Sequence, residues 1–336
     1  MSSRKLIVSG SPHIHTGNSV KSMMWGVVVA LLPAVAFSIY AFGIGALIVL
    51  LASVLGCVLV EFLIQKYMIG GKPTIANGSA VITGVLLALN LPSNIPVWIV
   101  LIGCIVAIGL GKYAFGGLGQ NIFNPAILGR VFLLISFPQQ MTSWPLPIVN
   151  RMNYADATTG ATFLGHMKMS GMSAIDTSTG ATAVKNLNEF APENLEWLDA
   201  FIGNMGGSMG EISAIALLIG GIFLLLKRII SWHIPVSIIA TVMLFSWCAG
   251  IDPVMAVLSG GVLLGAIFMA TDYVTSPMTH NGMLLYGVMI GVITMIIRLW
   301  GAYPEGVSFA ILIMNGFTPL INKYMHPRRF GERRFK

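Results

Sequence analysis

The sequence predicts an all-α polytopic membrane protein of about ten transmembrane helices, arranged as two inverted five-helix repeats. Composition, the length of the apolar segments and their grouping support this fold class. Of the 336 residues, 56% are hydrophobic and only 9% are charged, whereas about 25% are charged in a soluble domain. A helix needs about 20 apolar residues to cross a bilayer, because every backbone N–H and C=O in lipid must be paired within the helix.

One long polar stretch, residues 139–209, separates the apolar segments into two groups of five. It defines an N-terminal arm (1–21), a first repeat (22–138), a loop (139–209), a second repeat (210–322) and a basic tail (323–336). We expect helices near residues 22–42, 44–68, 76–91, 96–111 and 121–137, and then near 210–226, 233–249, 254–270, 282–298 and 306–322.

Lysine and arginine residues gather on one side of the predicted bundle. Ten crossings put both termini on the same side, and fourteen of the 19 Lys and Arg residues fall there. The loop on the opposite side holds only Arg151, Lys168 and Lys185. Since basic residues stay on the cytoplasmic side, we expect a protein of the inner (cytoplasmic) membrane with cytoplasmic termini and an extracytoplasmic loop. The net charge of +7 then reflects topology and anionic lipid and indicates no nucleic-acid partner.

Two pairs of segments resemble each other at matching positions of the two halves. GSAVITGVLLALNLPSN at 78–94 resembles SGGVLLGAIFMATDYVTSP at 259–277, and FGGLGQNIFNPAILGRVFLLI at 115–135 shares Ala-Ile-Leu with WGAYPEGVSFAILIMNGFTPLI at 300–321. Because each half has an odd number of crossings, the second half enters the membrane from the opposite face. The repeat is therefore predicted to be inverted.

The matching segments also indicate a candidate pocket. In proteins with inverted repeats, broken helices at matching positions line a ligand site near the membrane midplane. The polar or small residues there are Gly117, Asn121 and Asn124 in the fifth segment and Thr271 and Asp272 after the eighth. An equally weighted alternative is that glycine and proline only allow close helix packing.

Few ionisable residues lie inside the predicted spans. Glu61 is within the second segment, where a charge costs about 2.5 to 3.5 kcal/mol to insert, so we consider it an ion-pathway candidate; the alternative is that it reaches the interface. The six histidines are not expected to face one another inside the bundle, which argues against a transmembrane haem. No metal-binding spacing of cysteines is present, and Cys57, Cys104 and Cys248 are interpreted as packing residues. We assign no metal site and no catalytic residue.

The loop contains two near-copies of one motif, DATTGATFLG at 156–165 and DTSTGATAVK at 176–185. Each copy has an aspartate six residues before, and a threonine three residues before, the last threonine of Gly-Ala-Thr. Such residues usually form local turns, so the motif alone means little. Other stretches give it significance: SPHIH at 11–15, GGLGQNIFNPAILGRVFLLISFP at 116–138, QMTSW at 140–144, GSMGEISAIALLIGG at 207–221, SWHIPVS at 231–237, MATDYVTSPMT at 269–279 and GAYPEGVSFAIL at 301–312.

Together these stretches strongly resemble the RnfD family, the D-type membrane subunits of the Rnf electron-transport complex, over nearly the whole chain and in the same order. The NqrB family, the B-type subunits of the sodium-pumping NADH:quinone reductase, is related, but its members usually have a longer N-terminal extension. In both families a threonine in a D-x-x-[ST]-x-A-T stretch carries FMN through a phosphoester bond. The resemblance implies the same here, on a loop that a separate flavin transferase can reach.

The duplicated motif offers two attachment residues. Thr162, with Asp156 and Thr159, is favoured because Ala157, Leu164 and Lys168 also resemble the family pattern. Thr182 is the alternative because it lies closer to the next landmark of the family, GSMGE.

The resemblance implies a membrane subunit of an ion-translocating ferredoxin:NAD⁺ oxidoreductase complex, which relays electrons through covalent FMN and couples redox chemistry to Na⁺ or H⁺ transport. It also implies a possible second, non-covalent flavin (riboflavin or FMN) and partners that include the flavoprotein RnfG and the membrane proteins RnfA and RnfE. Two other functions stay open: a channel or transporter without redox chemistry, and a structural anchor for redox partners.

Overall fold

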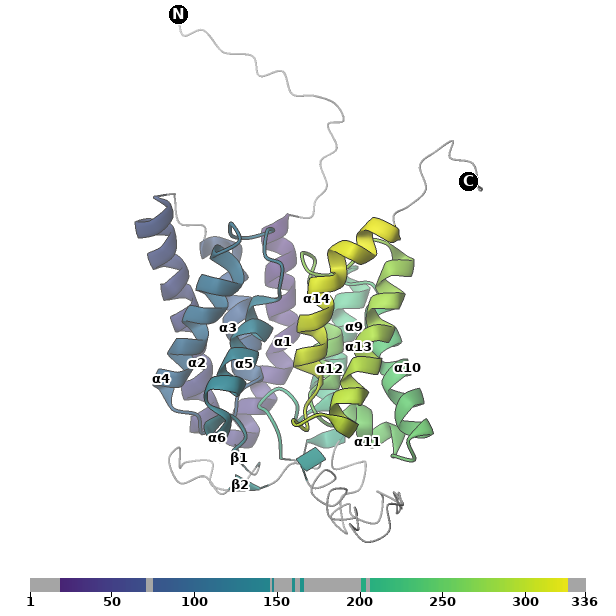
Figure 1. Cartoon of the computed structure of the whole chain (residues 1–336). Coiled ribbons are helices and arrows are strands. Elements are labelled where there is room, and N and C mark those ends of the chain that lie inside the picture. Colours follow the sequence, from purple (N-terminus) through teal and green to yellow (C-terminus); the bar gives the residue numbers. More distant parts are fainter. Residues whose placement is uncertain are drawn as a thin grey trace, which may run out of the picture.

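The structure, a computed structural model, describes residues 19–70, 75–145, 147, 159–160, 164–165, 201–203 and 206–325. These residues form a mostly helical bundle, as predicted (Figure 1). Helix α1 begins and helix α14 ends at the same end of the bundle, which we call the terminal end. The short helix α6 and the strands β1 and β2 lie at the opposite end, which we call the loop end (Figure 1).

The first half of the bundle consists of helices that end or begin close to the predicted positions. Two of them continue as π-helices, η1 and η3. The elements are α1 (Val20–Phe42), α2 (Ile44–Leu63), η1 (Ile64–Ile69), η2 (Ile75–Asn77), α3 (Ser79–Leu89), α4 (Val97–Ile105), η3 (Val106–Tyr113), α5 (Pro125–Ser136) and α6 (Pro138–Met141).

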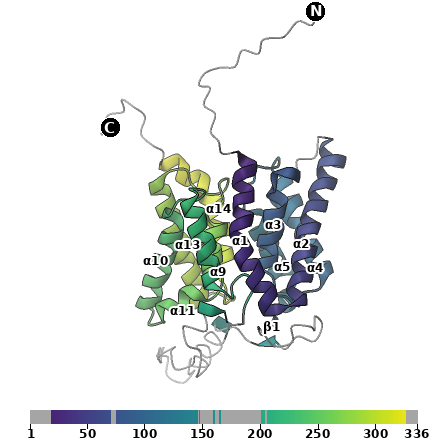
Figure 2. The ribbon, with the colours of Figure 1, turned by 180° about the vertical axis from the view of Figure 1, so that it is seen from behind.

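The second half follows a two-stranded antiparallel ladder. Strand β1 (Trp144–Pro145) pairs with β2 (Thr159–Gly160). The helices are α9 (Ala214–Leu226), α10 (His233–Cys248), α11 (Pro253–Leu258), α12 (Val262–Leu264), the π-helix η5 (Gly265–Met269), α13 (His280–Trp300) and α14 (Val307–Tyr324). Figure 2 shows from behind that α1 lies at the border between the halves, where it packs against α9.

Apolar side chains cover much of the outside of the bundle. Leu55 and Leu244 are each 64% exposed and Ile135 is 60% exposed, a pattern that suits lipid rather than water. In the described part of the chain, three helices are long and apolar enough to cross a membrane: Val20–Phe42, Ile44–Ile69 and His280–Trp300. The number of ten crossings and the inverted relation of the halves stay predictions.

Side-chain oxygens fix several helix starts. Ser19, Asn124, Ser213, Asp252 and Thr279 are N-cap residues, and each accepts a hydrogen bond from a backbone N–H in the first turn of its helix. Such a cap satisfies one of the backbone donors that a helix start leaves unpaired. The short polar residues between apolar segments therefore determine where the helices begin.

Non-helical breaks interrupt both halves. Helix α3 ends at Leu89, and no helix follows until α4 begins at Val97. The predicted span 254–270 is divided between α11 and α12 at Ser259–Gly261, where Gly260 and Gly261 have φ of 69° and 67°. Only glycine adopts this left-handed conformation readily. The third segment of each half is thus short or broken, as the sequence comparison predicted.

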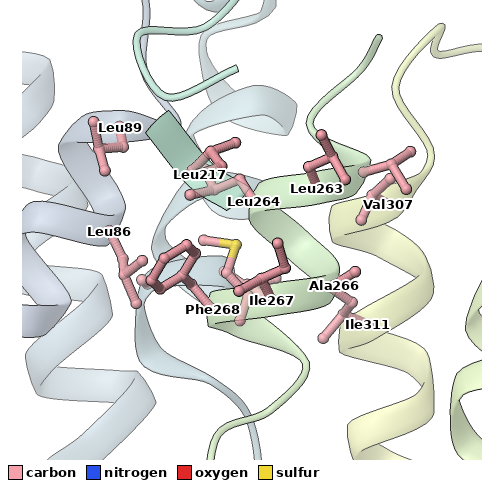
Figure 3. Close-up of a cluster of buried hydrophobic side chains, with 14 of the residues drawn as sticks. Leu86, Leu89, Leu217, Leu263, Leu264, Ala266, Ile267, Phe268, Val307 and Ile311 are labelled. Carbon is pink, nitrogen blue, oxygen red and sulfur yellow. The ribbon is translucent and has the colours of Figure 1, made fainter. Parts of the chain in front are cut away.

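The second of these broken helices contributes to the centre of the hydrophobic core. Figure 3 shows Leu263, Leu264, Ile267 and Phe268 of α12 and η5 between the first half and α14. Leu86 and Leu89 of α3 lie on one side, and Val307 and Ile311 of α14 on the other. A rearrangement at the break would therefore disturb side-chain packing in both halves.

Candidate functional site

The favoured threonine motif lies partly outside the described residues. Asp156, Thr162 and Thr182 are not among them, whereas Thr159 belongs to β2. In the β1–β2 ladder Trp144 faces Gly160 and Pro145 faces Thr159. Two residues of the motif, Thr159 and Gly160, are thereby paired with the segment that follows α5 and α6 at the loop end.

Residues just after position 162 also contact the bundle. Leu164 packs against Gly260 at the break between α11 and α12, where a Cβ atom would collide with the leucine side chain. Gly165 lines a cavity at the loop end. The described residues on both sides of position 162 are therefore anchored to the loop end of the bundle.

This cavity has a volume of about 220 Å³, and we call it the loop-side cavity. It contains two aromatic side chains and one buried ion pair, Arg130 with Glu305. Its walls are Arg130, Leu134, Met141, Thr142, Trp144, Gly165, Tyr303, Pro304 and Glu305.

Arg130 connects the two halves beside this cavity. Its Nη1 donates hydrogen bonds to Asn90 Oδ1 at 2.9 Å and to Ser308 Oγ at 2.6 Å, and its Nη2 pairs with Glu305 Oε2. Asn90 follows α3 in the first half, whereas Ser308 lies in the first turn of α14 and Glu305 lies just before that helix. Arg130 is 4% exposed, so its charge is held by protein groups rather than by water.

The segment Gly207–Glu211 bonds to both broken helices. The backbone N–H of Met209 donates to the carbonyl oxygen of Leu91 at 3.2 Å, and that of Gly210 donates to the carbonyl oxygen of Leu89, the last residue of α3, at 2.7 Å. Glu211 accepts a hydrogen bond from the N–H of Gly260 at the other break. We call this segment the clamp.

Arg298 of α13 completes the second break. Its guanidinium donates to the carbonyl oxygens of Ala256 at 2.6 Å and Ser259 at 2.8 Å. These carbonyls have lost their helical partners because the helix stops at Leu258. The break is therefore held on one side by Glu211 and on the other by Arg298.

Four of the five predicted pocket residues line one cavity nearer the terminal end. Asn121, Asn124, Thr271 and Asp272 all contact this cavity, which has a volume of about 80 Å³, whereas Gly117 is not part of its lining. We call it the terminal-side cavity. Its other walls include Met24, Ser79, Thr83, Lys112, Phe268 and Tyr273. The sequence comparison thus selected residues from both halves that are spatial neighbours.

These polar residues also have partners within the protein. Asn124 caps α5 through Oδ1, and its Nδ2 donates to the carbonyl of Met269 at 3.1 Å. Asn121 Nδ2 donates to the carbonyl of Phe123 at 3.1 Å, and the Thr271 hydroxyl donates to the carbonyl of Ile267 at 2.6 Å. They therefore shape the breaks as well as the cavity wall.

Glu61 is part of a buried polar cluster rather than an isolated charge. Its Oε2 accepts a hydrogen bond from Lys112 Nζ at 2.7 Å, and its Oε1 accepts from Gln65 and from the Tyr113 hydroxyl, both at 3.2 Å. Lys112 also donates to Ser79 Oγ at 2.7 Å. Because Lys112 and Ser79 line the terminal-side cavity, the cluster connects Glu61 to that cavity.

Two of the histidines stack on each other, which the sequence did not suggest. The rings of His233 and His280 have centroids 4.4 Å apart and are inclined by 16°. They begin α10 and α13 at the terminal end and leave no room for an iron between them. Among the described residues, no group of three or more His, Cys, Asp or Glu is arranged to hold a metal.

Comparison with known proteins gives the family. The family described as NQR2, RnfD, RnfE matches residues 7–331. The chain belongs to this family. Three relatives match the chain along nearly their full lengths.

The D-type subunit of the proton-translocating ferredoxin:NAD(+) oxidoreductase complex of Clostridium ljungdahlii is 42% identical, covering 97% of this chain and 96% of its own. The D-type subunit of the Na(+)-translocating ferredoxin:NAD(+) oxidoreductase complex of Acetobacterium woodii is 44% identical, covering 100% and 98%. The D-type subunit of the ion-translocating oxidoreductase complex of Stutzerimonas stutzeri is 40% identical, covering 94% and 93%. Members of similar identity are thus named for different ions.

Proposed function

We propose that the chain is the D-type membrane subunit of an ion-translocating ferredoxin:NAD⁺ oxidoreductase complex and relays electrons through FMN bound covalently to Thr162. The relatives named above support the assignment to such a complex, because their similarity extends over almost the whole of both chains. The proposal of a covalent FMN is supported by the motif in the loop and by the contacts that described residues near Thr162 make with the bundle.

The anchoring of the motif is the observation that carries this proposal. Gly160 is paired in the β1–β2 ladder and Leu164 packs against Gly260. Both residues are two positions from Thr162 in the sequence, and Thr162 itself lies outside the described residues. A flavin attached there would stay at the loop end of the bundle, close to the loop-side cavity. The comparison of the two motif copies favours Thr162, and Thr182 stays the alternative.

The proposed topology has ten crossings in two inverted halves, with cytoplasmic termini. Basic residues support this orientation, because they gather at helix ends on the terminal side of the bundle and such residues mark the cytoplasmic side. They are Lys21, Lys66, Lys227, Arg228 and Lys323. The loop end then faces outward. Partners in the complex are proposed to include the flavoprotein RnfG and the membrane proteins RnfA and RnfE.

A second, non-covalent flavin stays a proposal for the terminal-side cavity. Asn121, Asn124, Thr271 and Asp272 supply polar groups there, but the volume of about 80 Å³ is far below the roughly 300 Å³ at which pockets for larger ligands begin. The cavity in this conformation does not fit a flavin ring, and we derive no electron-transfer step through it.

The attachment is tested with the purified chain, produced together with a flavin transferase. Wild type, Thr162→Ala, Thr182→Ala and the double variant are compared by ultraviolet fluorescence of the band in a denaturing gel. We expect fluorescence to be lost in Thr162→Ala and retained in Thr182→Ala. Loss only in Thr182→Ala would transfer the attachment to the second copy. A wild type without fluorescence would refute the covalent flavin and favour a channel or an anchor.

A further inference from the structure

Buried polar atoms without a hydrogen-bond partner gather in one region of the bundle. Within the described part of the chain there are six such side-chain atoms, and five of them lie around the second break and the loop-side cavity. None of their residues is more than 8% exposed. An unpaired buried polar group costs about 1 to 3 kcal/mol, so five in one region call for a common partner. They are Arg130 Nε, Ser259 Oγ, Thr294 Oγ1, Arg298 Nε and Glu305 Oε1.

Contacts place the residues of the second half beside one another. Arg298 Nη2 donates to the carbonyl oxygen of Ser259 at 2.8 Å. Thr294 is four residues before Arg298 and so lies on the same face of α13. A Cβ added at Gly306, the residue after Glu305, would lie 2.6 Å from the carbonyl oxygen of Thr294. The unpaired atoms therefore belong to neighbouring side chains.

Two positive and two negative side chains meet in this region. Arg130 pairs with Glu305, and Arg298 interacts electrostatically with both Glu305 and Glu211. Glu211 is 5% exposed and accepts a hydrogen bond from the N–H of Gly260 at the second break. With all four side chains ionised, their charges sum to zero. We use the name charge cluster for Arg130, Glu211, Ser259, Thr294, Arg298 and Glu305.

The mixture of unpaired groups determines the class of ligand. The guanidinium N–H groups of Arg130 and Arg298 only donate, the carboxylate oxygen of Glu305 only accepts, and the two hydroxyls do both. The arginines would repel a metal cation, and Glu305 would repel an anion. Water is neutral and both donates and accepts, and a buried water typically makes about three hydrogen bonds to polar groups of this kind.

The loop-side cavity supplies room at one end of the charge cluster. Arg130 and Glu305 line this cavity, which has a volume of about 220 Å³. A cavity must offer roughly 10 to 15 Å³ to hold one water molecule. The cavity therefore has space for several waters beside the ion pair.

We propose that the charge cluster binds a group of ordered water molecules that extends from the loop-side cavity to the second break. The waters accept hydrogen bonds from the Nε–H groups of Arg130 and Arg298 and donate to Glu305 Oε1. They also bond to the hydroxyls of Ser259 and Thr294. Because Arg130 belongs to the first half and the others to the second, water then joins the two halves and connects the buried carboxylates to the loop end.

The hydroxyl of Ser259 offers a test in which two outcomes have opposite signs. If it is bonded to water, Ser259→Ala removes a hydrogen bond and lowers the denaturant concentration at the midpoint of unfolding. If it is unpaired, the same change removes a penalty and raises the midpoint. We expect a lower midpoint, and an unchanged or higher one would overturn the proposal.

Ser246→Ala is the matched control. Ser246 is 0% exposed, but its hydroxyl bonds to carbonyl oxygens of its own helix, α10, among them that of Met243 at 3.2 Å. The loss of that intrahelical bond is offset by the better helix propensity of alanine, so the midpoint should hardly move. Thr294→Val removes the second hydroxyl of the cluster and should lower the midpoint as Ser259→Ala does.

A density map of the intact complex from electron cryomicroscopy tests the site directly, at a resolution that shows ordered waters. We expect separate peaks at about 2.7 to 3.2 Å from most of the five unpaired atoms, and none at the hydroxyl of Ser246. Well-resolved side chains without such peaks would overturn the proposal. So would a single peak that disappears when sodium chloride is replaced by potassium gluconate, because it would be an ion. Neither test depends on a bound flavin, so both keep their meaning if the proposed function fails.

Discussion

Replacing Lys112 by methionine should destabilise the folded protein strongly, because it leaves a buried carboxylate without its cation. Lys112 is 2% exposed and Glu61 is 1% exposed. Their Nζ and Oε2 atoms are 2.7 Å apart. Methionine has nearly the length of the lysine stem, so the variant tests the charge and its hydrogen bonds more than packing.

The expected loss is about 3 to 5 kcal/mol in the free energy of unfolding, the usual cost of removing one partner of a buried ion pair. Glu61 keeps its hydrogen bonds from Gln65 and Tyr113, but these neutral donors do not replace the positive charge. The double variant Glu61→Gln with Lys112→Met should recover most of the loss, because replacing both members of a buried pair is often neutral or stabilising.

The measurement is an unfolding titration of the purified protein in mixed detergent, followed by tryptophan fluorescence. Lys227→Met is the control, since this lysine is exposed at the end of α9; it should change the free energy by less than about 0.5 kcal/mol. A loss below about 1 kcal/mol in Lys112→Met, or a double variant as unstable as the single one, would contradict the view that the pair is held out of water.

Three further results are expected. Gly84→Ala should lower the free energy of unfolding by about 1 to 3 kcal/mol, because the new Cβ would lie 2.7 Å from the Cα of Val54. The control is Gly109→Ala, where the atom nearest to a new Cβ is Ile64 Cδ1 at 4.0 Å; it should not lower the free energy in the same titration. Arg298→Met should lose about 2 to 4 kcal/mol, since it leaves buried carbonyl oxygens at the break unpaired; a loss below about 0.5 kcal/mol would contradict that role. Glu61→Gln in the intact complex should lower ion transport into vesicles at least tenfold, and an unchanged rate would exclude it from the ion pathway.

The helical bundle could be predicted from the sequence because it follows from two strong physical constraints. Lipid requires apolar segments of a given length, and a backbone in lipid requires internal hydrogen bonds. Glycine and polar residues then marked where the third segment of each half is interrupted. The comparison of 78–94 with 259–277 noted that both segments contain glycines, but the expected spans near 76–91 and 254–270 did not indicate how short α3 is or that the second segment breaks at Ser259–Gly261.

Buried charge pairs could not be predicted in the same way. Lys112 counted toward the basic side of the membrane, and nothing local to it indicates that it bonds to Glu61, 51 residues earlier. Arg130 and Glu305 both belong to stretches that were compared as repeats, yet the pairing across the halves depends on three-dimensional packing. Charge counting identifies a side of the membrane but does not tell a solvated lysine from a buried one.

The candidate pocket was predicted in part for a physical reason. Asn121, Asn124, Thr271 and Asp272 all come from places where a helix is interrupted, and interrupted helices expose backbone groups that need polar neighbours. Such residues gather around a cavity whether or not it binds a ligand. The loop-side cavity was missed because its polar residues, Arg130 among them, lie inside or next to helices rather than at a break.

The clamp has a consequence for how the protein is made. The carbonyl oxygens of Leu89 and Leu91 receive hydrogen bonds from Met209 and Gly210, which the ribosome adds about 120 residues later. Until then these two carbonyl oxygens lack the hydrogen bonds that a backbone in lipid requires. Water or the insertion machinery must therefore solvate them during synthesis. If the gene were split between the halves, the polypeptide of the first half would therefore be stable only when the polypeptide of the second half is also made. In this respect the two halves differ from repeats that fold independently.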